Sequence, residues 1–87
     1  MAQLGADVEQ LDQLSKKFDQ EAQALSQATS QITAQVNSTW WKGPDADKFR
    51  SEWHGQHAAA LAKVAQALDE AGKQASRNAS QQEAASR

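Results

Sequence analysis

The sequence predicts an all-α fold, a hairpin of two long antiparallel helices that forms a four-helix bundle when two hairpins pair. Two observations predict it. Apolar residues recur at helical spacing along most of the 87 residues, and a single Gly-Pro break interrupts them near the middle. We expect one helix over about residues 6–39, a turn over 40–44 and a second helix over about 45–76. We expect the hairpin domain to span residues 1–80 and residues 77–87 to form a flexible C-terminal tail.

The first helix is predicted from a seven-residue repeat of large apolar side chains. A second apolar row lies beside the first, and the two rows form the stripe of a helix that packs at a shallow left-handed crossing. No glycine or proline interrupts residues 6–39. The repeat consists of Leu4, Leu11, Phe18, Leu25 and Ile32, and the second row of Val8, Leu14, Ala22, Ala28 and Val36.

The break between the helices holds the only proline of the chain, Pro44, directly after Gly43. Proline suits the first position of a helix, where its missing N–H has no partner to lose, and glycine accepts the positive φ of a tight turn. Asp45 and Asp47 follow in the first helical turn, where the helix dipole favours acidic side chains. A large aromatic side chain beside this turn is expected to close the end of the bundle. The turn motif consists of Trp41, Lys42 and Gly43.

The second helix keeps the apolar spacing of three and four residues, but its large side chains become fewer and alanine replaces them. Gly55 and Gly72 are weak points, each costing about 1 kcal/mol relative to alanine if it is exposed. From about Ser76 the stripe has no large apolar residue, which predicts a frayed or disordered tail. The stripe carries Ala46, Phe49, Trp53, Ala60, Leu61, Val64, Leu68, Ala71 and Ala75.

The two stripes together predict a packing seam that a partner subunit completes. The chain has sixteen large apolar side chains (Val, Ile, Leu, Met, Phe and Trp), which make a thin core for a monomer. Burying one such side chain contributes roughly 1.5–3 kcal/mol, so a second hairpin is expected to supply the missing half. The predicted seam consists of Leu11, Leu14, Phe18, Leu25, Ile32, Phe49, Trp53, Val64 and Leu68.

The composition excludes most catalytic chemistry. The absence of cysteine excludes a disulfide framework, a thiolate metal site and a cysteine nucleophile. The serines and carboxylates are spread over polar helix faces, without a Ser-His-Asp arrangement. His54 and His57 can share a helix face, but a zinc site would need a third ligand. We therefore expect a protein that is not an enzyme and that binds no metal or cofactor.

Charge and hydropathy exclude two classes of partner. The formal net charge is −2, and no block of basic residues of the kind that binds nucleic acid is present. No stretch approaches the roughly 20 apolar residues of a membrane span, so we expect no stable membrane insertion. Residues 1–7 lack the basic region and the apolar run of a cleavable signal peptide. Export, if it occurs, is expected to use another route.

Trp41-Lys42-Gly43 between two long amphipathic helices, followed by residues 44–49, resembles the WXG100 (ESAT-6-like) family over about residues 4–80. The resemblance implies helical hairpins that pair antiparallel into four-helix-bundle homodimers, or heterodimers with another WXG100 protein. It also implies secretion without a cleaved signal peptide by the type VII (ESX) system of actinobacteria and Firmicutes, after a cytoplasmic pool. The ATPase of that system recognises a C-terminal segment of its substrates. The composition looks more like that of actinobacterial members.

The C-terminal segment departs from the pattern of the family. Actinobacterial members commonly carry a Tyr-x-x-x-Asp/Glu export motif after the second helix, and this chain has no tyrosine. The nearest analogue begins at Ala79 and ends at Glu83. Two functions therefore stay open. One is a dimeric effector or co-substrate exported by a type VII system, and the other is a non-enzymatic heterodimerising adaptor or chaperone for a larger secreted partner.

Overall fold

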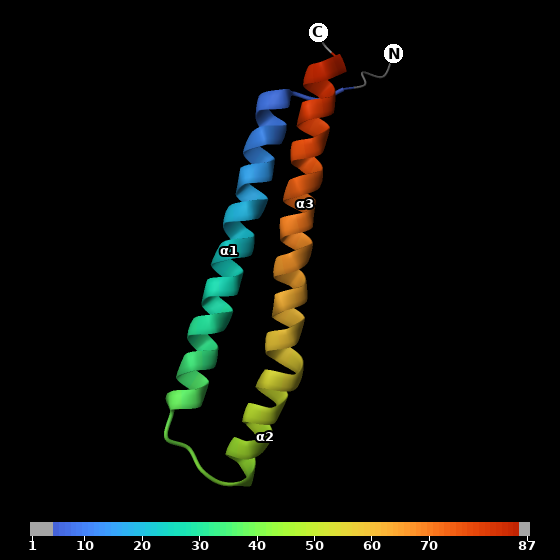
Figure 1. Cartoon of the computed structure of the whole chain (residues 1–87). Helices are drawn as coiled ribbons and strands as arrows, with labels where there is room; N and C mark the ends of the chain where they lie inside the picture. Colours follow the sequence, from blue (N-terminus) through green and yellow to red (C-terminus); the bar gives the residue numbers. More distant parts are fainter. Residues whose placement is uncertain (1–4, 86–87) are drawn as a thin grey trace.

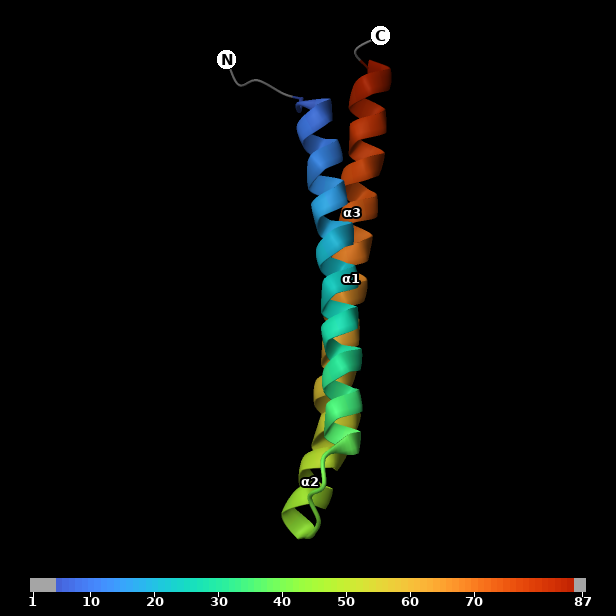
Figure 2. The same ribbon diagram turned by 90° about the vertical axis from the view of Figure 1, so that its left-hand side faces the viewer.

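The computed structural model describes residues 5–85, which fold into one long helical hairpin (Figure 1). Its elements are α1 (Val8–Ser38), α2 (Pro44–Glu52), the π-helix η1 (Trp53–His57) and α3 (Ala58–Ala85). The described residues form no strand, so the predicted all-α hairpin is confirmed. In a view turned by 90°, α1 and α3 overlap over most of their length (Figure 2). The hairpin is thus a rod of 64 × 21 × 17 Å, one helix thick.

Helix α1 begins two residues later and ends one residue earlier than the sequence predicts. The side chain of Asp7 accepts a hydrogen bond of 3.0 Å from the backbone N–H of Gln10. This N-cap satisfies one of the N–H groups that the first helical turn leaves unpaired. The helix ends at Ser38 and is capped by Thr39, whose backbone is extended (φ −72°, ψ 127°) while its N–H still bonds the carbonyl oxygen of Gln35.

The second arm contains a change of helical pitch that the sequence did not predict. The backbone N–H of Ala58 bonds the carbonyl oxygen of Trp53, five residues earlier, which makes η1 a π-helical turn. Because the π-helical turn is wider, Trp53 and Ala58 face the same side of the helix although they are five residues apart. Both are partly buried, and Leu61 continues this partly buried row. Ala60 and Val64, which the predicted stripe included, are exposed instead.

The prediction of a flexible tail was wrong for residues 77–85, because α3 continues to Ala85. Ala75 and Ala79 are buried there, at 7% and 2% exposed. Small side chains allow α3 to lie close against α1, so this end is held by close contact and needs no large apolar residue. Leu4, the first residue of the predicted repeat, and residues 86–87 lie outside the described residues.

Small residues fill the interior between the helices. No large side chain among the described residues is fully buried. Gly72 marks a place of close approach, where the Ser15 hydroxyl donates a hydrogen bond of 2.8 Å to the Gly72 carbonyl oxygen. A Cβ at this position would lie 3.1 Å from Cβ of Phe18 and 3.1 Å from the carbonyl oxygen of Ser15. The buried residues are Ala22, Ala46, Ala65, Gly72, Ala75 and Ala79.

Replacing Gly72 with alanine is expected to destabilise the hairpin by up to about 2 kcal/mol net. Overpacking costs about 1–3 kcal/mol, and the better helix propensity of alanine offsets up to about 1 kcal/mol of that. Urea unfolding followed by circular dichroism measures the change. Gly55→Ala is the matched control, because nothing lies within 4 Å of a Cβ built at Gly55, and it should be neutral or stabilising. Equal effects of the two substitutions would contradict a close approach at Gly72.

Candidate functional site

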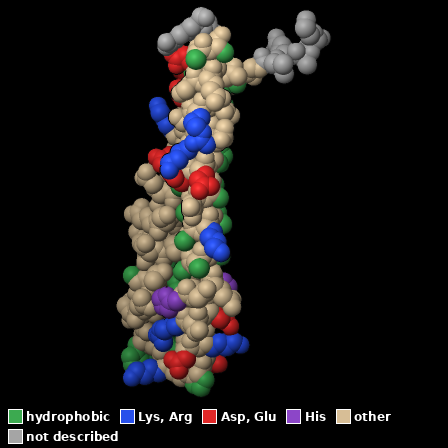
Figure 3. Space-filling view, turned by 45° about the vertical axis from the view of Figure 1, so that its right-hand side comes forward, with side chains coloured by type: hydrophobic (Ala, Val, Ile, Leu, Met, Phe, Trp, Pro, Cys, Tyr) green, Lys and Arg blue, Asp and Glu red, His purple; other side chains and the backbone are tan. Residues whose placement is uncertain are grey.

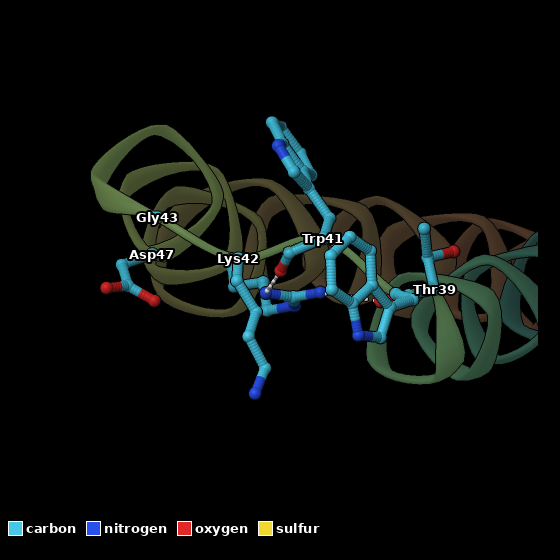
Figure 4. A pocket seen from close by; sticks show the side chains of 7 residues that line it. Thr39, Trp41, Lys42, Gly43 and Asp47 are labelled. Carbon is cyan, nitrogen blue, oxygen red and sulfur yellow. Dashed lines mark hydrogen bonds between the residues drawn. The ribbon is translucent and has the colours of Figure 1, made fainter.

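The turn at the tip of the hairpin links α1 to α2 through residues 39–43 (Figure 4). Gly43 adopts a φ of 124°, a backbone conformation that residues with a Cβ rarely adopt. Its carbonyl oxygen accepts a hydrogen bond of 3.0 Å from the N–H of Asp47. Pro44 stands at the start of α2, and Asp45 lies with Asp47 in its first turn. The structure thus shows the backbone roles predicted for Gly43 and Pro44.

Arg50, which the sequence did not single out, ties the turn to the end of α1. Its guanidinium donates hydrogen bonds of 2.8 Å to the carbonyl oxygens of Thr39 and Trp41, and a longer one of 3.4 Å to that of Val36. Carbonyl groups at the end of a helix lack intrahelical partners, and the helix dipole favours a cation there. These contacts leave no signature in the sequence, because they depend on where the turn brings the backbone.

The two adjacent tryptophans of the turn have different surroundings. The ring of Trp41 packs against Phe49, with 5.4 Å between the ring centroids and an angle of 51° between the planes, a favourable tilted geometry. Trp41 stays 42% exposed, whereas Trp40 is 84% exposed. Both line a shallow hollow together with Lys42 and Asp47, and the Trp41 and Lys42 side chains diverge there (Figure 4). Trp41 therefore partly covers the tip, while Trp40 faces solvent.

Two polar contacts continue from the turn along the rod. The indole Nε1 of Trp53 donates a hydrogen bond of 2.9 Å to Oγ1 of Thr33, and Nε2 of His54 lies 2.9 Å from Oδ1 of Asn37. His57 is exposed, with its ring 6.3 Å from that of Trp53. Side chains of α2 and η1 thus hold the last turns of α1 by hydrogen bonds as well as by packing.

One side of the rod carries large apolar side chains open to solvent. Leu14 and Ile32 are each 46% exposed, and Val64 is 49% exposed. Leu14 and Ile32 lie about five full helical turns apart and therefore on the same side of α1. Leu14 and Phe18 of α1 line a hollow with Leu68 of α3, and Val64 precedes Leu68 by about one turn. We call these five residues the apolar face.

The other boundary between α1 and α3 combines polar side chains with alanine and carries no large apolar residue among those that line its hollows. Hollows there are lined by side chains such as Asp19 and Gln23 of α1 and Gln66 of α3, and Asp69 pairs with Lys73 at 3.1 Å. Charged side chains of both signs also run along the side seen in Figure 3, where hydrophobic side chains form only small patches. One solvated side and one apolar side are the pattern of a helix pair that packs against another element.

The predicted packing seam divides into two groups. One group is half-buried between the helices, and the other is more than 40% exposed. The sequence pattern could not separate them, because neighbouring rows on a helix differ by only about 40° in direction. The half-buried group consists of Leu11, Phe18, Leu25, Trp53 and Leu68. The exposed group consists of Leu14, Ile32, Phe49 and Val64.

Ala79 and Glu83, the candidate export-tail residues, lie in the last turns of α3. Ala79 is 2% exposed and belongs to the interior of the hairpin, whereas Glu83 is exposed. A receptor that approaches this end would meet Glu83 and not the alanine. The first residue of the segment that the sequence offers as the nearest analogue of the export motif is therefore a buried small residue.

The part of the chain that the structure describes offers little chemistry beyond these surfaces. Within residues 5–85, no group of three His, Asp or Glu side chains is placed to hold a metal ion. None of the helices there combines the length and apolar character needed to cross a membrane.

The chain matches no protein-family model, and no curated protein or solved structure shows significant similarity to it. Fold-level likeness to a functional class would in any case be an analogy, because function depends on the site.

Proposed function

We propose that this chain is a small protein exported by a type VII (ESX) secretion system and that it acts as a dimeric helical-bundle effector or co-substrate. The observation that carries the proposal is an incomplete core. The buried residues of the hairpin are alanine and glycine, while Leu14, Ile32 and Val64 of the apolar face stay nearly half exposed. Trp41-Lys42-Gly43 stands at the turn of this hairpin, as the resemblance to the WXG100 family requires.

A second hairpin laid on the apolar face would complete a four-helix bundle. Each large apolar side chain that passes from full exposure to full burial contributes roughly 1.5–3 kcal/mol. Leu14, Ile32 and Val64 are about half exposed in the hairpin. Burying the exposed half of each side chain on pairing would therefore contribute about half of that free energy. Both hairpins contribute such residues, which makes pairing the favoured way to cover the face.

The rim of the apolar face does not select a charged partner. Lys17 and Glu21 line the same hollow as Leu14 and pair with each other at 3.1 Å. Their charges cancel locally, so the rim repels neither a second copy of the chain nor a related hairpin. The proposed partner is accordingly a homodimeric copy or another WXG100 protein.

The same fold supports a second candidate function, a non-enzymatic heterodimerising adaptor or chaperone for a larger secreted partner. The observation that favours it lies at the end of α3. The chain has no tyrosine, and the nearest analogue of the export motif begins at the buried Ala79. A subunit without an export tyrosine would depend on its partner for recognition by the type VII ATPase. In both cases the protein has a cytoplasmic pool before it is secreted.

Leu14→Asp is expected to prevent pairing while leaving the single hairpin helical. Leu14 is 46% exposed in the hairpin, so an aspartate carboxylate there stays hydrated in the monomer. In the four-helix bundle the same carboxylate would be buried with no cation or hydrogen-bond donor to compensate its charge. Size-exclusion chromatography with light scattering, on the chain alone and mixed with its genomic neighbour, measures the mass. Gln23→Asp adds the same charge on the polar side and should leave pairing intact. Loss of pairing in both variants would argue against the apolar face.

Export is tested by expressing the chain in an actinobacterial host with a functional type VII system. We expect the protein in the culture filtrate of the parent strain, and only in the cell pellet of a strain whose type VII ATPase is inactive. A resident substrate of the same system serves as the positive control. Retention of the chain in the pellet while the control substrate is exported would refute export.

A further inference from the structure

We propose that Arg50 is the positioning residue of the turn. Its guanidinium holds residues 39–41 in one backbone conformation against the end of α1, and so determines where Trp40 and Trp41 stand. The inference concerns the conformation of this chain alone and holds or fails independently of dimerisation and export.

Arg50 bonds the backbone both before and after Trp40. Arg50 reaches the carbonyl oxygen of Thr39, directly before Trp40, and that of Trp41, directly after it, each at 2.8 Å. Its Nε adds a longer contact of 3.4 Å to Val36 in the last turn of α1. The turn is thereby tied through a side chain of α2 to the helix that precedes it.

The guanidinium suits this task for a chemical reason. It carries five N–H donors in a rigid planar fork, whereas the ammonium of lysine is a single point from which three separated carbonyl oxygens cannot be reached together. Hydrogen bonds from a charged donor are stronger than neutral ones. Arg50 is half-buried, and none of the ion pairs between described residues involves it. Its charge is thus directed to the backbone of the turn.

Other hydrogen bonds hold the two ends of the turn but not its middle. The N–H and the hydroxyl of Thr39 bond the carbonyl oxygen of Gln35 at 3.0 and 2.6 Å, and the carbonyl oxygen of Gly43 accepts from the N–H of Asp47. Trp40 is 84% exposed, so packing of its ring does not hold its backbone. Gly43 has nothing within 4 Å of a Cβ built on it. Trp41 packs on Phe49, which restrains its ring, and the clamp by Arg50 restrains the peptide groups on either side of Trp40. An exposed tryptophan on a fixed backbone loses less conformational freedom when it is contacted.

Limited trypsin digestion of the full chain tests the inference at the Lys42–Gly43 bond, with the Lys63–Val64 bond inside α3 as an internal reference for opening of the whole hairpin. Arg50→Lys and Arg50→Gln are compared with Lys48→Gln, a matched control on the exposed side of α2. We expect both Arg50 variants to be cut at Lys42–Gly43 at least about tenfold faster, because losing one hydrogen bond to a charged group already corresponds to about that factor. The control should be cut at the wild-type rate.

Two results would overturn the proposal. One is cleavage of either Arg50 variant at Lys42–Gly43 at the wild-type rate. The other is equal acceleration at Lys42–Gly43 and Lys63–Val64, which would mean that Arg50 stabilises the hairpin as a whole. Backbone ¹⁵N relaxation of Trp40 and Trp41 gives a second readout, since loss of the clamp should raise the picosecond-to-nanosecond motion of these amides but not of those near Gly72.

Discussion

The close approach of α1 and α3 along a stripe of alanine and glycine is the constraint on which the rest of the molecule depends. Ser15 bonds the carbonyl of Gly72 across this contact, and there is no room even for a methyl group at Gly72 without movement. Helices this close leave no space between them for Leu14, Ile32 or Val64. Those side chains therefore lie to one side and form a surface that is too apolar to be well solvated.

The tip of the hairpin is held in a different way from the middle. Near Gly72 the helices touch through backbone and small side chains, with the Ser15 hydrogen bond across the contact. Near the turn they are joined by hydrogen bonds from the larger side chains of Arg50, Trp53 and His54. Arg50 bonds carbonyl groups of the turn, and Trp53 bonds Thr33. The π-helical turn η1 lies between α2 and α3 and holds one more residue than an α-helical turn. The partly buried sides of α2 and α3 can therefore both face α1. Hydrogen bonds thus add to packing at the tip, where Ala46 of α2 is fully buried.

The sequence predicted the elements better than the contacts. Helical periodicity and the Gly43-Pro44 break placed both arms and the turn, since these signals are local. The extension of α3 to Ala85 was missed, because alanine stripes look weak when only large side chains are counted. Leu11 is half-buried and Leu14 is exposed because of the angle at which the two helices pack, and the same angle divides the rest of the predicted seam. The hydrogen bonds of Arg50 depend on the path of the turn. Neither the packing angle of the helices nor the path of the turn can be read from the local spacing of residues.

Thermal unfolding over a range of protein concentrations tests most directly whether one hairpin is an incomplete core. If the apolar face must be covered, the folded state is the dimer, and its midpoint rises with concentration by mass action. For a chain that pairs only with a relative, we predict cooperative unfolding only after the related hairpin is added. A lone monomeric hairpin that unfolds cooperatively, at a midpoint unchanged over about a hundredfold range of concentration, would contradict the need for a partner.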